Sequence, residues 1–212
     1  MDKQKRNGAI GIILIIILFI ISSYLVQKNI DFFTNNINVG IFGILIFILI
    51  VVISIVIAPV SVIPLFPLGI GIWGWVNTAI LAIIGWTIGA TIAFLLARKF
   101  GVALVEKIIP IKKIHDLEKH IPDKHLFLTI IFLRAVVPID GVSYLFGLFS
   151  KIPLRPYVLA TIIGLIPSSF AISYLGTIPI LYQIIFTLMA SVIFIAGLII
   201  ANRSKSKNKT KT

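Results

Sequence analysis

Long apolar runs dominate the chain, and several are long enough to cross a bilayer. The first, at 8–26, holds no charged residue, and a helix of this length covers a hydrocarbon layer of ~30 Å at ~1.5 Å per residue. The whole chain has a mean hydropathy of +1.13 and 59% hydrophobic residues, whereas a soluble domain has roughly 45–50%. We therefore expect an all-α integral membrane protein.

Five of the apolar runs predict continuous membrane spans. They lie at 8–26, 39–58, 76–97, 157–176 and 178–201. No small-x-small cleavage site follows the first run, which indicates a retained span rather than a secretory signal. Basic residues gather before the first run and after the last. Cytoplasmic flanks carry such charges, so we expect both termini in the cytoplasm.

Two further apolar segments are broken by proline and glycine, and we expect them to form re-entrant hairpins near 59–76 and 126–150. Proline removes a backbone donor and clashes with the preceding turn, so neither segment can be one straight helix. Broken backbone at membrane depth is tolerated only where it is buried in protein or lines a wet cavity. The residues expected to shape the hairpins are Pro64, Pro67, Pro138 and Gly141.

Each broken segment is followed by a span that carries glycine, so two units of similar design occupy 59–97 and 126–176. The stretch AILAIIG in the first unit resembles VLATIIG in the second. Paired interrupted segments are typical of transporters built as an inverted repeat. Two cytoplasmic termini require an even number of crossings, so one broken segment must cross, which gives about five to six transmembrane helices. The expected organisation is a first span with a polar linker at 1–38, a central domain at 39–176, and a last span with a basic tail at 177–212.

Arg134 and Asp140 lie in the second broken segment, where a charge at the bilayer centre costs at least ~2.5–3.5 kcal/mol. In the functional interpretation both line a wet cavity, where Arg134 binds an anionic head group and Asp140 carries a proton or orients the arginine. The alternative is an internal salt bridge that only fixes the hairpin. On a straight helix the two side chains would point to different faces, so a bridge requires the bend at Pro138 and Gly141.

Other function classes have little support. The net charge of +12 gathers at the ends of apolar runs and does not form a basic face with interleaved aromatic residues, which argues against nucleic acid as a partner. The chain has no cysteine. His115, His120 and His125 do not share a helix face, so no metal site is expected. Ser143 has no base nearby for nucleophilic catalysis, and we expect neither enzymatic activity nor a cofactor.

Three segments together resemble the VTT-domain membrane proteins, also called the SNARE-associated Golgi protein or DedA-like superfamily. They are GWTIGATIAFLLARKFG at 85–101, RAVVPIDGVSYLFGL at 134–148 and YVLATIIGLIPSSFAISYLG at 157–176. The resemblance implies two facing re-entrant hairpins and a protein that moves lipids across the bilayer. The positions that match the family pattern are Arg134, Pro138, Asp140, Tyr144, Gly147, Thr161, Gly164 and Pro167.

The resemblance also implies roles for individual residues. Arg134, Asp140 and Tyr144 are expected to bind substrate, and Gly147 and Pro167 are expected to help shape the hairpins. Many DedA members carry acidic residues in the first hairpin, whereas residues 32–105 hold no Asp or Glu. The chain therefore resembles a branch without them, and Asp140 is the one carboxylate expected inside the membrane for proton coupling.

We therefore expect a flippase or scramblase that moves a phosphate-bearing lipid, such as a polyprenyl phosphate or a phospholipid, between leaflets. Its partners would be membrane lipids with anionic head groups. A proton-coupled exporter of small ions and a non-transporting assembly or scaffold protein are the alternatives. Gly85 and Gly89 permit close helix packing within one chain or in a homo-oligomer. The composition, rich in isoleucine and lysine, resembles that of low-GC prokaryotes, so the expected location is the plasma membrane.

Overall fold

The computed structural model describes residues 3–29, 31–32, 40–57, 61–101, 125–136, 142–186 and 189. Its elements are α1 (Lys3–Lys28), α3 (Gly40–Val56), the 3-10 helix η1 (Ile63–Leu65), α4 (Phe66–Phe100), α7 (Leu126–Val136), α8 (Val142–Phe149) and α9 (Leu154–Leu175). A further helical stretch covers 180–186. These residues include no strand, and the all-helical class expected from the sequence is confirmed.

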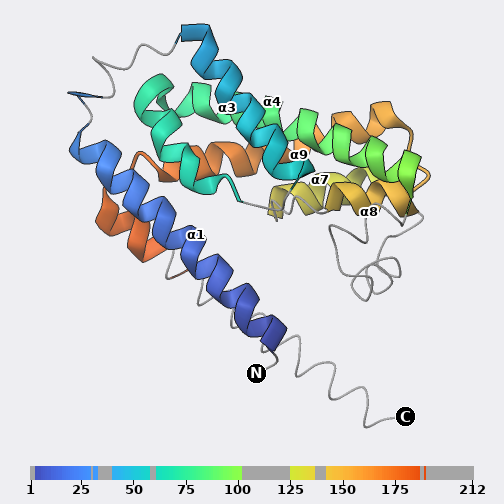
Figure 1. Cartoon of the computed structure of the whole chain (residues 1–212), viewed down its shortest axis with the longest axis horizontal. Helices are drawn as coiled ribbons and strands as arrows, with labels where there is room; N and C mark the ends of the chain where they lie inside the picture. The colour runs from blue at the N-terminus through green and yellow to red at the C-terminus, as the bar shows by residue number, and fades with distance from the viewer. Residues whose placement is uncertain are drawn as a thin grey trace.

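The antiparallel pair α4 and α9 forms the centre of the fold (Figure 1). Trp75, early in α4, contacts Phe170 and Tyr174 late in α9, with ring centroids 6.0 and 5.7 Å apart. Phe94, late in α4, stacks on Tyr157 early in α9 with centroids 4.1 Å apart. Around this pair, α3 and α8 pack against α4, and α7 packs against α9.

The outward faces of the helices are apolar. Residues 63–100 and 154–175 are long and apolar enough to cross a membrane, and an 18-residue stretch within each has a mean hydropathy of 2.3 and 1.9, respectively. In α3, Ile41 and Phe42 are 69% and 77% exposed. Exposed apolar surface of this extent is rare on monomeric soluble proteins, whereas the hydrocarbon of a bilayer covers it without cost. The surface therefore agrees with the membrane class expected from the sequence.

A break at Gly74 divides α4 into two helical parts. Gly74 has φ 78° and ψ 164°, a conformation open to glycine and strained for other residues. Pro64 lies in η1, and Pro67 lies in the first turn of α4, where the missing N–H has no helical partner to lose. The sequence predicted that proline and glycine break this segment. Both prolines lie where α4 begins, and within the described part of α4 the helix is interrupted at Gly74.

Gly147 and Pro167, both expected to shape hairpins, lie inside helices. Gly147 is part of α8, and a Cβ there would stand 2.8 Å from the Cβ of Ala97 and closer still to the carbonyl oxygen of Phe94. The glycine therefore permits α8 to lie against α4. Pro167 lies within α9, which continues through it. A proline removes one backbone hydrogen bond, and the packing of α9 against α4 and α7 keeps the helix intact.

Glycine also permits two other close helix crossings. A Cβ on Gly85 of α4 would lie 2.8 Å from the Cβ of Val51 in α3. A Cβ on Gly164 of α9 would lie 2.7 Å from the Cβ of Arg134 in α7. Real Cβ atoms do not approach so closely, so each crossing requires a glycine.

Where helices end or break, side chains from other elements donate hydrogen bonds to the free carbonyl groups. An unsatisfied carbonyl is costly in a low-dielectric interior. In a continuous helix these carbonyl groups would accept from the next turn. At an end or a break they cannot, and the side-chain hydrogen bonds stabilise them instead. The pairs are Ser22 with Pro64 at 2.9 Å, Tyr144 with Val56 at 2.6 Å, Arg98 with Ser150 at 2.7 Å and with Ile152 at 3.0 Å, and Gln27 with Gly176 at 3.3 Å and with Ile178 at 3.0 Å.

Candidate functional site

Arg134 is a buried charge in the last turn of α7. Its side chain is 2% exposed. The crossing at Gly164 brings the arginine against the backbone of α9. The C-terminal end of a helix carries partial negative charge, so a cation in the last turn is favoured by about 0.3–1 kcal/mol. That is less than the cost of burying a charge, and further partners are required.

Two hydroxyl groups hold one side of the guanidinium. Arg134 Nη2 donates to Ser143 Oγ at 2.5 Å and to Tyr157 Oη at 3.2 Å. Tyr157 Oη donates in turn to the carbonyl oxygen of Ala90 at 3.4 Å. The arginine of α7 is therefore tied to α8 and α9 directly, and to α4 through the tyrosine.

The other donors of the guanidinium face no acceptor in the described part of the chain. Nε is buried without a hydrogen-bond partner among the described residues, and the bonds of Arg134 to Ser143 and Tyr157 both start from Nη2. A guanidinium has five N–H donors in a planar fork that matches two oxygens of a phosphate or carboxylate. Nε–H lies on the Nη2 side of the group and Nη1 lies on the Cδ side, so these free donors belong to different edges of the guanidinium. Each can make a charge-assisted contact with an oxygen of an anion.

The remaining predicted site residues lie elsewhere. Asp140, Pro138 and Gly141 fall outside the described residues, so the pairing of Arg134 with Asp140 stays a prediction. Tyr144 is 1% exposed and donates its hydroxyl to the carbonyl of Val56, and its binding of substrate stays a prediction. The described residues include no group of three or more His, Cys, Asp or Glu side chains that could hold a metal ion.

An aromatic column extends the site along α4. The ring of Phe94 lies 4.1 Å from the ring of Tyr157, and the guanidinium of Arg98 lies 4.2 Å from the same Phe94 ring. Arg98 also donates to two carbonyl groups after α8. The position of Tyr157 is therefore fixed by stacking on one side and by hydrogen bonds at its hydroxyl.

Sequence reasoning did not assign Ser143, Tyr157 or Arg98 to this site. Ser143 was considered only as a nucleophile. A detectable signal for Tyr157 was helical spacing, because it shares one face of α9 with Thr161 and Gly164. No comparable signal identified Arg98, which contacts the turn after α8 only because the helices pack as they do.

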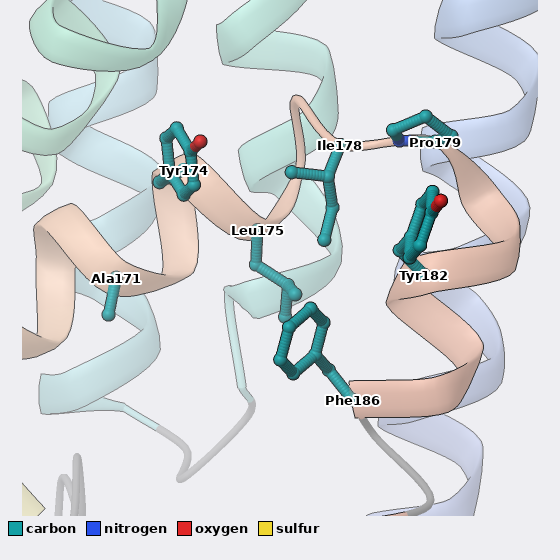
Figure 2. A pocket seen from close by; sticks show the side chains of 7 residues that line it. All are labelled: Ala171, Tyr174, Leu175, Ile178, Pro179, Tyr182 and Phe186. Carbon is teal, nitrogen blue, oxygen red and sulfur yellow. The ribbon is translucent and has the colours of Figure 1, made fainter.

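A separate groove lies at the far end of α9 (Figure 2). Its volume is about 550 Å³. The lining has no charged residue, and its polar side-chain atoms are the hydroxyls of two tyrosines. Such a surface suits hydrocarbon rather than a charged head group. The lining residues are Ala171, Tyr174, Leu175, Ile178, Pro179, Tyr182 and Phe186.

Comparison with models of protein families gives a match to the VTT domain over residues 59–178. The matched range is more than half of the 212 residues, and it contains α4, α7, α8 and α9. Arg134 and both of its hydrogen-bond partners therefore lie within the matched domain. Searches of the curated proteins and of the solved structures gave no match.

Proposed function

Because the chain belongs to the VTT-domain family of membrane proteins, we propose that it moves a phosphate-bearing lipid between the two leaflets of a bilayer, as a flippase or scramblase. The observation that carries this proposal is the guanidinium of Arg134. It is 2% exposed, yet its Nε and Nη1 have no acceptor among the described residues. Fully buried charges are expensive unless paired, so the site favours an anionic partner.

The proposed role of Arg134 is to bind the head-group phosphate through its free N–H donors, Nε and Nη1. Ser143 and Tyr157 hold Nη2 and so fix the plane of the guanidinium. The acyl or prenyl tail stays in the hydrocarbon, and only the polar head group moves through the protein. This arrangement replaces the desolvation cost of crossing bare hydrocarbon with a charge-assisted contact.

We also propose that α3–α4 and α7–α9 are two copies of one unit, inverted across the membrane. In each copy a helix is followed by a short helical segment and then by a long helix that carries a crossing glycine. The crossing partners are Val51 for Gly85 and Arg134 for Gly164, and in both cases the glycine also lies close to the carbonyl three residues before that partner. Arg134 thus occupies in the second copy the place of Val51 in the first. An inverted repeat supplies equivalent access from both leaflets.

The test is transport by the purified protein in lipid vesicles. Fluorescent phospholipid and labelled polyprenyl phosphate are incorporated, and protein-dependent movement between leaflets is measured for Arg134→Ala and Arg134→Lys. Hydrogen bonds to charged groups contribute about 1.5–3 kcal/mol, so Arg134→Ala should slow movement by at least about tenfold. Arg134→Lys should fall between, because lysine lacks the planar fork. Arg155→Ala, an exposed arginine of α9, is the matched control and should transport normally.

Other outcomes would favour the alternatives. A folded Arg134→Ala protein that moves lipid normally would remove the head-group role. Ion movement without lipid movement would indicate an exporter. Activity restored by the exchange of Arg134→Asp with Asp140→Arg would indicate that the pair is a structural salt bridge. Neither lipid nor ion movement in the unaltered protein would indicate an assembly or scaffold role.

A further inference from the structure

One i, i+4 row of α9 carries hydroxyl side chains over most of the helix. Tyr157, Thr161, Ser169 and Ser173 are spaced by four or eight residues, so they follow this row as it winds about the helix, with Leu165 at the intermediate position. All four are 0% exposed. We call these four residues the hydroxyl seam. At ~1.5 Å per residue the seam is ~24 Å long, which is most of the ~30 Å hydrocarbon thickness.

Three hydroxyls of the seam have no hydrogen-bond partner among the described residues. They are Thr161 Oγ1, Ser169 Oγ and Ser173 Oγ. A serine or threonine inside a helix usually donates to a carbonyl of the preceding turn. Thr91 does so to Thr87 at 2.7 Å. The three hydroxyls of the seam do not, although they are completely buried.

Other elements carry unpartnered groups at the same levels as the seam. The antiparallel register of α4 and α9 places Trp86 and Thr87 near the level of Thr161, and both Trp86 Nε1 and Thr87 Oγ1 lack a partner within the described residues. Arg134 Nε lies at the Tyr157 end, since the arginine bonds that tyrosine.

The other end of the seam meets a polar cluster between α1 and the segment after α9. Gln183 is 0% exposed, and its Nε2 donates to Ser23 Oγ at 2.7 Å and to the Ile178 carbonyl at 2.9 Å. Its Oε1 has no partner in the part of the chain that the structure describes. Ser23 Oγ in turn lies 3.4 Å from the carbonyl of Gly176, one turn beyond Ser173.

We propose that the hydroxyl seam is a water-bearing path inside the protein, which leads from the Gln183 cluster to Arg134. Buried polar groups without partners are rare, and those in native proteins are commonly satisfied by ordered water. Here most of them belong to one row of α9 or lie near its ends, instead of being scattered. Water supplies both donors and acceptors, so it can satisfy the hydroxyls, Trp86 Nε1 and Gln183 Oε1 alike.

The path would bring water and protons through the protein to Arg134, which lies in the membrane-spanning part of the chain. In this respect the inference rests on the proposed function, because an anion that binds and leaves Arg134 must exchange with water. The water itself can be measured without transport, so the two proposals can fail separately.

The test uses the absence of cysteine from the chain. Single variants Thr161→Cys, Ser169→Cys and Ser173→Cys are reconstituted in vesicles, and the infrared S–H stretching band is followed after transfer to D₂O. The matched controls are Ala160→Cys, at a position of the same helix that is 0% exposed, and Ile55→Cys, at a position of α3 that is 2% exposed. We expect the three seam variants to lose the S–H band at once and the two controls to keep it. Equal protection of seam and control thiols would overturn the proposal.

A second measurement needs no substitution. Radiolytic footprinting oxidises side chains that contact water, including buried water. We expect oxidation of Trp86 and Tyr157 in the reconstituted protein, and none of Phe66, which is also 0% exposed. Protection of all three would overturn the proposal even if a cysteine variant failed to fold. Rapid exchange along the seam together with normal lipid movement by Arg134→Ala would retain the path and refute the head-group role.

Discussion

Gly164 of α9 lies directly against Arg134 of α7, because a Cβ on the glycine would stand 2.7 Å from the Cβ of the arginine. The glycine therefore sets where the guanidinium lies. We predict that Gly164→Ala pushes α7 away from α9 and moves Nη2 off Ser143 and Tyr157. Overpacking of this kind costs about 1–3 kcal/mol. Thermal unfolding in detergent should register that loss, and lipid movement should fall toward the level of Arg134→Ala.

The control for this prediction is Gly85→Ala. The same clash arises there, since a Cβ on Gly85 would lie 2.8 Å from the Cβ of Val51, but no charge is displaced. The thermal midpoint should fall by a similar amount while the folded fraction keeps its transport rate. If both variants lose stability and both transport normally, Gly164 does not position Arg134.

Tyr157→Phe tests the hydroxyl that holds Arg134. The variant keeps the ring stack on Phe94 at 4.1 Å and loses the bonds to Arg134 and to the Ala90 carbonyl. A hydrogen bond to a charged group contributes about 1.5–3 kcal/mol, so we expect a lower thermal midpoint and slower lipid movement. Tyr174→Phe, at a tyrosine that is 57% exposed, should change neither. Transport unaffected by Tyr157→Phe would show that the arginine needs no such support.

Arg98→Lys tests the turn after α8. Arg98 donates to Ser150 and Ile152 at 2.7 and 3.0 Å and lies over the ring of Phe94. Lysine has no planar fork and cannot reproduce both bonds with the stack, so we expect a loss of about 1 kcal/mol. Lys99→Ala, at the exposed neighbouring position, should leave the thermal midpoint unchanged. Equal midpoints for Arg98→Lys and the unaltered protein would contradict the assigned role.

The sequence was sufficient for the helical class, the family and the buried cation, because each depends on local composition or on a short motif. Long apolar runs can form only helices when they must satisfy their own backbone groups. Arg134 was identifiable because a charge in an apolar segment is costly and so rarely incidental. These inferences need no knowledge of how the helices pack.

The partners of Arg134 were not predictable in the same way. Ser143 and Tyr157 meet the arginine because Gly164 sets the crossing of α7 and α9, and no single segment encodes that register. The sequence also left open which residue of the first broken segment interrupts the helix. Proline fits the first turn of a helix, so Pro67 begins α4, and the interruption falls at Gly74.

Tyr144→Phe separates the role expected from the family pattern from the role that the structure gives. The hydroxyl of Tyr144 donates to the carbonyl of Val56 at 2.6 Å, in the last turn of α3. A buried carbonyl that loses its donor costs about 1–3 kcal/mol, so we expect a lower thermal midpoint. Transport per folded molecule should be unchanged, because the hydroxyl has no hydrogen bond to Arg134 within the described residues. If the thermal midpoint is unchanged and a labelled lipid binds more weakly, Tyr144 binds the substrate. Its hydroxyl would then exchange the hydrogen bond to Val56 for one to the lipid head group.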